Sequence, residues 1–322
     1  MIEVLKSGVC RTVQAALDFL EANPEEEKKI LVHPGIYEEQ VTVRIPGVEL
    51  GGEKGKAEET VITCGLGGKE ILEDGMKRGT FRTYTMFVDA DDVTLRDLTI
   101  ENSAGPGTRV GQAIALYADG DRMVIADCRL LGWQDTLFTA PLPPKEIEKN
   151  GFIGPKQYAP RTNGRQYYKN CYIEGEVDFI FGGATAYFEN CTIFSKDVDR
   201  EPVKGYVTAP STPEGLEYGY VMEGCRFTSN CPEQSVFLGR PWREWGQTVL
   251  LRCEIGPHIK AEGWDDWGKE MAHRTAVFAE YGCTGPGAAL ENRADWSRRL
   301  TEQEAEHYTR ERVLAGADGW RP

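Results

Sequence analysis

Three short motifs carry the residue types that catalysis needs. Asp135 stands within Gly-Trp-Gln-Asp-Thr-Leu-Phe, and Asp178 opens the segment Asp-Phe-Ile-Phe-Gly, so each aspartate has apolar and aromatic neighbours. Arg240 also has apolar and aromatic neighbours, within the segment Leu-Gly-Arg-Pro-Trp. Two carboxylates and one guanidinium in apolar settings suit acid–base or nucleophilic chemistry on a neutral substrate. We therefore expect the fold to bring Asp135, Asp178 and Arg240 together.

The charge balance limits the possible partners. The chain of 322 residues has a formal net charge of −14 and a sequence pI of about 4.9. Such a chain repels nucleic acid and anionic membrane surfaces, and it repels a polyanionic polymer except where its positive side chains cluster. No apolar run approaches the roughly 20 residues of a membrane span. We expect neither nucleic acid nor a membrane as a partner.

Cysteine usage and the first residues bear on the compartment. There are nine cysteines, an odd count that would leave one thiol over if the others formed disulfides. The start of the chain, Met1–Gly8, has no basic region followed by a long apolar one, so no signal peptide is visible. We expect a cytoplasmic protein with reduced thiols. The alternative is a secreted protein whose leader is missing from this sequence.

The elements that must position the three motifs are mostly short strands. A helix is expected over 12–23, followed by many β-branched runs separated by Gly, Asn, Asp or Pro. Near the end, Thr301 and Glu304 have the capping-box spacing, which predicts a helix over about 301–314. A helix at each end would cover the open ends of a strand stack, and closed ends favour a monomer.

A repeated frame indicates how the strands are stacked. Five segments share a cysteine, then any residue, then a large apolar residue: Cys128–Leu130, Cys171–Ile173, Cys191–Ile193, Cys225–Phe227 and Cys253–Ile255. The intervals of roughly 20 to 43 residues are those of a solenoid. In a parallel β-helix, equivalent inward residues of successive coils stack, so these cysteines would form an interior ladder. The chain has no Cys-x-x-Cys pair and only 4 His, so we expect no zinc site.

A proline-rich stretch interrupts the strand pattern at 141–166. Long insertions of this kind between solenoid coils are surface loops, which often carry function. Because the stretch emerges directly after Asp135, we expect it to form one wall of a groove.

The chain resembles the pectin methylesterases (pectinesterases), family 8 of the carbohydrate esterases. The resemblance covers nearly the whole chain, and its segments occur in the family's order: Thr12–Ala16, Pro34–Glu39, Gly111–Leu116, Gly132–Leu137, Asp178–Gly182, Leu238–Trp242, Glu280–Tyr281 and Gly285–Ala288. It implies one right-handed parallel β-helix domain over 1–322, an all-β fold with short capping helices. It also implies hydrolysis of the C6 methyl esters of galacturonate units in pectin or methylated oligogalacturonides, with release of methanol and with no metal or organic cofactor.

The resemblance also assigns roles. Asp178 would be the nucleophile, with Arg240 as its charge partner, and Asp135 would protonate the departing methanol and then activate water. Gln112 and Gln134 would hold the oxyanion of the tetrahedral intermediates. Four aromatic residues are expected to bind sugar rings: Trp242, Phe181, Trp133 and Tyr158. Because a cytoplasmic enzyme would meet only short fragments, we expect a preference for methylated oligogalacturonides over intact pectin.

Other functions remain compatible with the same fold. The scaffold also serves pectate lyases and polygalacturonases. A lyase needs calcium and a base near C5, whereas a polygalacturonase needs two carboxylates across the glycosidic bond. An esterase or thioesterase of another acyl substrate is a further alternative. A non-catalytic carbohydrate-binding solenoid is the third, although both aspartates and the arginine are present.

Overall fold

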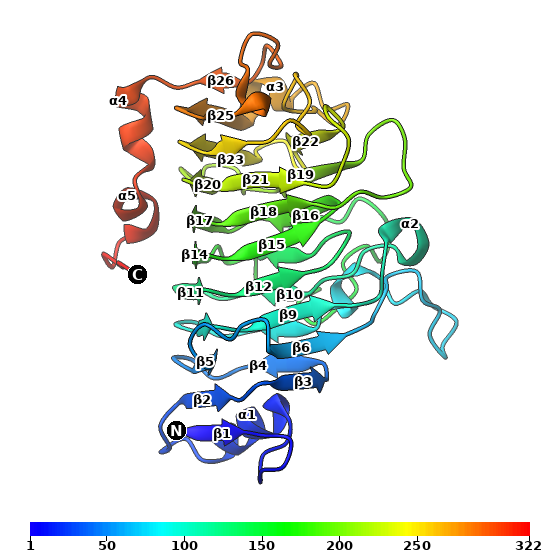
Figure 1. Cartoon of the computed structure of the whole chain (residues 1–322), viewed down its shortest axis with the longest axis vertical. Coiled ribbons are helices and arrows are strands. Elements are labelled where there is room, and N and C mark those ends of the chain that lie inside the picture. The colour runs from blue at the N-terminus through cyan, green and yellow to red at the C-terminus, as the bar shows by residue number, and fades with distance from the viewer.

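The computed structural model describes all 322 residues, and its strands form three parallel sheets. Successive strands pass from one sheet to the next, and each pairs with the equivalent strand one coil away, so the chain winds as a parallel β-helix. Figure 1 shows the coils stacked along the long axis from the N-terminus upward. The predicted parallel β-helix is confirmed.

The three sheets contain 11, 8 and 7 strands. The 11-stranded sheet contains β1 (Ile2–Val4), β2 (Lys29–Val32), β5 (Glu49–Gly52), β8 (Thr94–Arg96), β11 (Met123–Ala126), β14 (Arg165–Lys169), β17 (Thr185–Glu189), β20 (Tyr220–Glu223), β23 (Gln247–Leu251), β25 (Val277–Tyr281) and β26 (Arg298–Arg299). The 8-stranded sheet contains β3 (Gly35–Glu38), β6 (Thr60–Cys64), β9 (Thr99–Asn102), β12 (Arg129–Leu131), β15 (Tyr172–Gly175), β18 (Thr192–Ser195), β21 (Arg226–Ser229) and β24 (Glu254–Ile255). The 7-stranded sheet contains β4 (Val41–Val43), β7 (Met86–Val88), β10 (Leu116–Ala118), β13 (Leu137–Thr139), β16 (Val177–Gly182), β19 (Gly205–Pro210) and β22 (Val236–Gly239).

The cysteine frame marks a sharp corner between the 11-stranded and 8-stranded sheets. The residue before each Cys of the frame has a left-handed backbone, as at Asp127 (φ 54°) and Asn190 (φ 54°). Asp, Asn and Gly tolerate this conformation best, which explains why they recur there. The next residue turns into the core: Cys191 and Cys225 are at most 1% exposed, and their thiols contact backbone carbonyls one coil back. All nine cysteines are free.

The N-terminal end of the stack is closed by helix α1 (Val13–Ala22), as expected. Thr12 caps the helix, and the four buried apolar residues of the helix belong to the main core of 54 side chains. The carboxylate of Glu39 accepts the backbone N–H groups of Val13 and Gln14 at 2.8 and 2.9 Å. Two free donors of the first turn are therefore paired with a charge that also complements the helix dipole.

The C-terminal helix differs from the prediction in form and place. The capping box of Thr301 and Glu304 is present, but the segment breaks into α4 (Glu302–Ala305), a 3₁₀ turn η3 (Glu306–Tyr308) and α5 (Arg310–Ala315). Thr309 is extended, which interrupts the helix. The pieces run back along the outer face of the 11-stranded sheet (Figure 1), and Val313 and Leu314 pack there beside Tyr167 and Tyr187.

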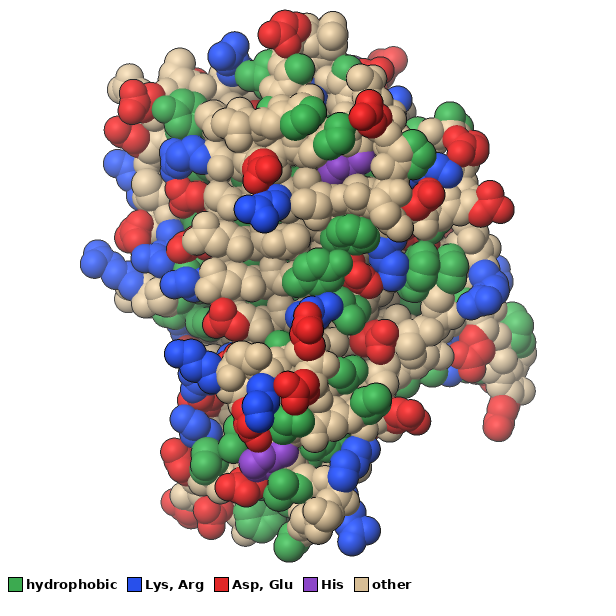
Figure 2. Space-filling model, in the orientation of Figure 1, with side chains coloured by type: hydrophobic (Ala, Val, Ile, Leu, Met, Phe, Trp, Pro, Cys, Tyr) green, Lys and Arg blue, Asp and Glu red, His purple; other side chains and the backbone are tan.

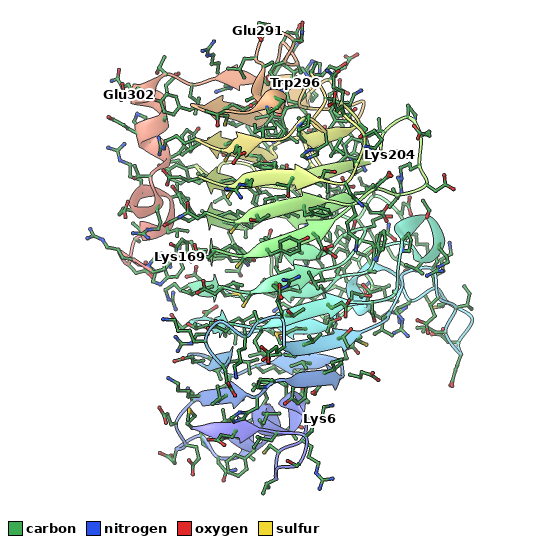
Figure 3. All side chains as sticks on the ribbon, in the orientation of Figure 1. Lys6, Lys169, Lys204, Glu291, Trp296 and Glu302 are labelled. Atoms are coloured by element: carbon green, nitrogen blue, oxygen red, sulfur yellow. The ribbon has the colours of Figure 1, made fainter.

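Other residues cover the C-terminal end of the stack. The helical turn α3 (Ala272–Thr275) supplies Ala272 to the main core, and Trp296 packs against that core beside Phe278. In Figure 3, Trp296 lies at this end, whereas Glu302 marks where the terminal segment begins its return along the side. Two further 3₁₀ turns and one short helix complete the elements: η1 (Thr80–Arg82), η2 (Pro286–Ala288) and α2 (Gly107–Val110).

The surface mixes both signs of charge. Figure 2 shows acidic and basic side chains interspersed over the face viewed, with single apolar side chains between them. No helix of the chain combines the length and apolarity that crossing a membrane requires.

Candidate active site

The register of the 7-stranded sheet stacks the two aspartates. Leu137 of β13 pairs with Ile180 of β16, so Asp135 and Asp178, each two residues earlier, hold equivalent positions in consecutive coils. Adjacent parallel strands lie about 4.8 Å apart, which makes the two backbones neighbours. Both residues have left-handed backbones, with φ of 66° at Asp135 and 50° at Asp178. The two consecutive coils that contain β13 and β16 thus each present one aspartate at this position.

Arg240 forms a bidentate ion pair with Asp178. Nε donates to Oδ1 at 2.8 Å, and Nη2 donates to Oδ2 at 2.7 Å. The guanidinium carbon also lies 3.7 Å from the ring centre of Tyr206 and 3.6 Å from that of Trp267. A two-pronged ion pair packed against aromatic rings fixes the direction of the carboxylate as well as its charge.

The two aspartates therefore differ in environment. Asp135 forms no ion pair, and each aspartate is 7% exposed. Burial raises the pKa of Asp135 well above its ordinary value, and the negative charges of Asp178 and Glu176 add to the rise against the opposing effect of Arg240. One carboxyl is paired with a full positive charge, and its neighbour favours the protonated form. This is the division of labour that an acid and a nucleophile require.

Glu176 is a third buried acid, which the sequence did not single out. One of its oxygens accepts the backbone N–H of Gly107, and the other has no partner. Burial raises its own pKa. A side chain at Gly107 would meet Gln134 at 2.3 Å and Glu176 at 2.9 Å, so the glycine allows these two to pack beside it. A lone glutamate before a strand carries no spacing signal, and only the folded coil reveals it.

The aspartates open into a cavity of about 870 Å³. Its lining brings together the residues singled out for catalysis: Gln112, Gln134, Asp135, Asp178 and Arg240. The long insertion forms one wall through residues 147–153, as expected from its place after Asp135. Lys156 anchors the insertion to the coils, with Nζ at 2.6 Å from the Asp89 carboxylate and 3.5 Å from that of Asp119.

The four expected sugar-binding residues divide into two groups. Trp242 and Phe181 line the cavity, and their ring centres lie 5.6 Å apart. Phe181 is only 3% exposed, so its ring supports Trp242 more than it offers a face of its own. Trp133 and Tyr158 do not line the cavity: Trp133 lies beneath Lys196, at 3.7 Å, and Tyr158 is 91% exposed.

Three further residues that line the cavity were not predicted from the sequence. Trp267 and Lys269 come from the loop after β24, and Arg243 follows Trp242. These residues are far from the aspartates along the chain, and only the stacking of coils brings their loops to the same groove. Their place in the groove therefore could not be predicted from the sequence. No three His, Cys, Asp or Glu side chains are grouped so that they would hold a metal ion.

A parallel β-helix whose groove holds one ion-paired aspartate, one unpaired aspartate and two amides has the side chains that a carboxylate-dependent hydrolase requires. The sequence profile of the family described as Pectinesterase matches residues 2–142 and 158–317. The chain belongs to the pectinesterase family, and it is a carboxylic ester hydrolase with pectin methylesterase activity. The internal stretch that the profile leaves unmatched, 143–157, falls inside the insertion that forms one wall of the groove.

Individual relatives are similar over nearly the whole of this chain. The chain is 35% identical to Pectinesterase 31 of Arabidopsis thaliana over 94% of this chain and 87% of that protein. Among solved structures, pectin methylesterase from carrot superimposes with a TM-score of 0.81 at 29% identity, covering 98% of this chain and 93% of the other. A pectin methylesterase in complex with a hexasaccharide superimposes with a TM-score of 0.77 at 30% identity, covering 100% and 98%.

Proposed function

We propose that Asp178 attacks the ester carbonyl and that Asp135 handles the protons. The Asp178 carboxylate adds to the C6 carbonyl, and the tetrahedral intermediate carries an oxyanion that the amides of Gln112 and Gln134 hold. Asp135 gives its proton to the methoxy oxygen as the carbon–oxygen bond breaks. Methanol leaves, and the galacturonyl group remains on Asp178 as a mixed anhydride.

The second half-reaction reverses the role of Asp135. Now ionised, Asp135 takes a proton from a water molecule that attacks the anhydride, and Asp178 leaves as a carboxylate. The products are the original enzyme and a galacturonic acid unit, which becomes a carboxylate when it releases its proton to solvent. The observation that carries this assignment is the contrast between the two stacked aspartates, one held by Arg240 and one buried without a cation.

The acid role of Asp135 predicts how Glu176 influences the pH profile. The first step needs protonated Asp135, so kcat/KM falls as the pH rises through its pKa. The negative charge of Glu176 contributes to the raised pKa of Asp135. Replacing it in Glu176→Gln lowers that pKa, and we expect the basic limb of kcat/KM to move to lower pH by about one unit. Initial rates of methanol release across pH provide the measurement.

Glu101→Gln is the matched control for this shift. Glu101 accepts one hydrogen bond, from Thr63 at 2.9 Å, and lies outside the cavity. Its variant should keep the wild-type profile. A basic limb that stays in place in Glu176→Gln would contradict the assignment of Asp135 as the acid.

Substrate length follows from the size of the groove. A cavity of about 870 Å³ lies near the upper end of the roughly 300–1,000 Å³ that small-molecule sites span. A few sugar units would fill this volume, so we expect added polymer length to contribute little binding. This supports a preference for methylated oligogalacturonides. A monomeric state and a cytoplasmic location stay predictions from the sequence.

We expect kcat/KM per methyl ester on a fully methylated hexamer to equal or exceed that on highly methylated pectin. Because unequal accessibility would distort a comparison at one concentration, both substrates are titrated and compared at equal ester content. A clearly higher efficiency on the polymer would overturn the preference while leaving the esterase assignment intact.

A further inference from the structure

The buried acid Glu176 contacts the segment that leads into Gln112. Glu176 is fully buried, and one of its carboxylate oxygens accepts the backbone N–H of Gly107. Gly107 is the first residue of α2, and Gln112 follows Gly111, the residue at which this helix ends. The N–H groups of the first helical turn have no partners within the helix, so a carboxylate bound to one of them fixes where the helix begins.

The other end of α2 is held by backbone hydrogen bonds. The N–H of Lys69 donates to the carbonyl of Val110 at 2.9 Å, and the N–H of Gly68 donates to the carbonyl of Gln112 at 2.8 Å. A Cβ atom at Gly68 would lie 3.2 Å from Oε1 of Gln112, so the amide packs directly on this glycine. With this end fixed, the contact at Gly107 determines how the short helix lies.

Gly107 also contacts the second amide. A Cβ atom at Gly107 would lie 2.3 Å from Oε1 of Gln134 and 2.9 Å from Oε1 of Glu176. The N–H of Ala113 donates to the carbonyl of Gln134 at 3.0 Å, so the segments that carry the two amides are bonded directly. Gly107 therefore lies where α2, Gln134 and Glu176 meet, and a shift of this residue would move Gln112 relative to Gln134.

Burial of the Glu176 carboxylate carries a cost. Its second oxygen has no hydrogen-bond partner. Burial raises the pKa of Glu176, and neither Arg200 nor Lys196, whose charges oppose that rise, forms an ion pair with it. A buried polar group with an unpaired oxygen destabilises a fold, so its presence beside a reactive groove calls for a role in that groove.

We infer that Glu176 is a positioning residue, which places the amide of Gln112 beside that of Gln134 by holding Gly107. The inference rests on the proposed function, in which these two amides hold the oxyanion of the tetrahedral intermediates. Preorganised donors stabilise an oxyanion only when they lie within hydrogen-bond distance of it. A misplacement of about 1 Å typically costs about 10²-fold in rate. This role is separate from the effect of Glu176 on the pKa of Asp135.

Two substitutions at Glu176 distinguish its position from its charge. Glu176→Gln loses the charge but keeps an oxygen that can accept the N–H of Gly107, whereas Glu176→Leu loses both. Each variant is measured with a methylated oligogalacturonide at its own pH optimum, so that a shifted pH profile does not enter the comparison. We expect kcat to fall about 100-fold in Glu176→Leu while KM changes by less than about threefold. In Glu176→Gln, kcat should stay within about threefold of the wild type.

A double-mutant cycle with Gln112→Ala tests whether Glu176 acts through that amide. Removing one oxyanion donor costs about 10²–10³-fold in kcat. Once the amide is absent, Glu176→Leu can no longer misplace it, so its additional effect should shrink to less than about tenfold. Effects that multiply in full would overturn the inference, as would a Glu176→Leu enzyme with the kcat of the wild type.

Glu39→Leu is the matched control for the loss of a carboxylate that holds the start of a helix. Glu39 accepts the backbone N–H groups of Val13 and Gln14 at the start of α1, and it lies outside the cavity. This variant should melt at a lower temperature and keep its kcat. A fall in kcat equal to that in Glu176→Leu would overturn the inference, because general loosening would then explain both.

Gly107→Ala provides a second route to the same displacement if Glu176→Leu does not fold. It leaves Glu176 in place, but its methyl group would meet the side chain of Gln134. We expect kcat to fall by about tenfold or more with little change in KM. An unchanged kcat would overturn the inference.

Failure of the inference and failure of the proposed function give different results. A large loss of kcat in Gln112→Ala without a loss in Glu176→Leu would overturn the inference alone. A wild-type kcat in Gln112→Ala would instead refute the assignment of Gln112 to the oxyanion, and the inference with it.

Discussion

Asp178→Asn is expected to abolish methanol release, with kcat falling by about 10⁴-fold or more, as when a catalytic nucleophile is removed from other hydrolases. The amide lacks the negative charge and the nucleophilic oxygen that the first step requires. Arg240 would keep one acceptor but lose its ionic partner. The oxyanion donors and the groove remain, so substrate binding should change much less than kcat. Direct measurement of methanol from a methylated oligogalacturonide provides both constants.

Stability must be checked alongside this rate. Removing one partner of a buried ion pair costs about 3–5 kcal/mol, so the variant is assayed at a temperature where circular dichroism shows it folded. Asp97→Asn is the matched control. Asp97 is also 7% exposed, with a left-handed backbone and one bond from the N–H of Gly55 at 2.7 Å, but it lies outside the groove. Folded Asp178→Asn enzyme that keeps more than about a hundredth of wild-type activity would contradict the nucleophile assignment.

Asp135→Asn carries the second largest expected effect. General acid–base catalysis contributes about 10²–10⁴-fold, and Asp135 acts in both half-reactions, so we expect a fall near the upper end of that range for methyl esters. The raised pKa of Asp135 is what makes it a proton donor, and an asparagine cannot replace that function. Rates with a methylated oligogalacturonide check the magnitude.

A substrate whose leaving group needs no protonation distinguishes the acid role of Asp135 from its role as a base. An aryl ester of the same sugar acid releases a phenolate that needs no protonation, so its first step in Asp135→Asn should stay fast. The second step still lacks its base. We expect a burst of one phenolate per enzyme followed by a slow phase. Equal slowing of both phases for the aryl ester would contradict the assignment of Asp135 as an acid in the first step.

Much of the fold could be predicted because its periodic features are local. The cysteine frame repeats once per coil, since each coil needs a left-handed corner followed by a small apolar residue that fits the interior. Asp or Asn before the cysteine adopts the left-handed conformation of that corner with less steric strain than most residues. The two aspartates proposed to be catalytic could be found for a similar reason, because each lies near the start of a strand of the 7-stranded sheet, within its own short motif.

Features that depend on contacts between distant coils could not be predicted. Trp267 reaches Arg240 from a loop with no repeat, and Glu176 touches Gly107 from a different coil. Trp133 is one of the four aromatic residues expected to bind sugar rings, yet it packs beneath Lys196 outside the cavity. The capping box fixed only the start of the C-terminal helix, since the break at Thr309 follows from packing against the sheet side.

The most direct test of the covalent route is the mass of the enzyme during its burst. Asp135→Asn is mixed with the aryl ester and quenched in acid, and the intact protein and its peptides are weighed. The account predicts one galacturonyl group per protein, located on the peptide that contains Asp178. A complete burst without any gain in mass, or a gain that maps to another residue, would contradict it.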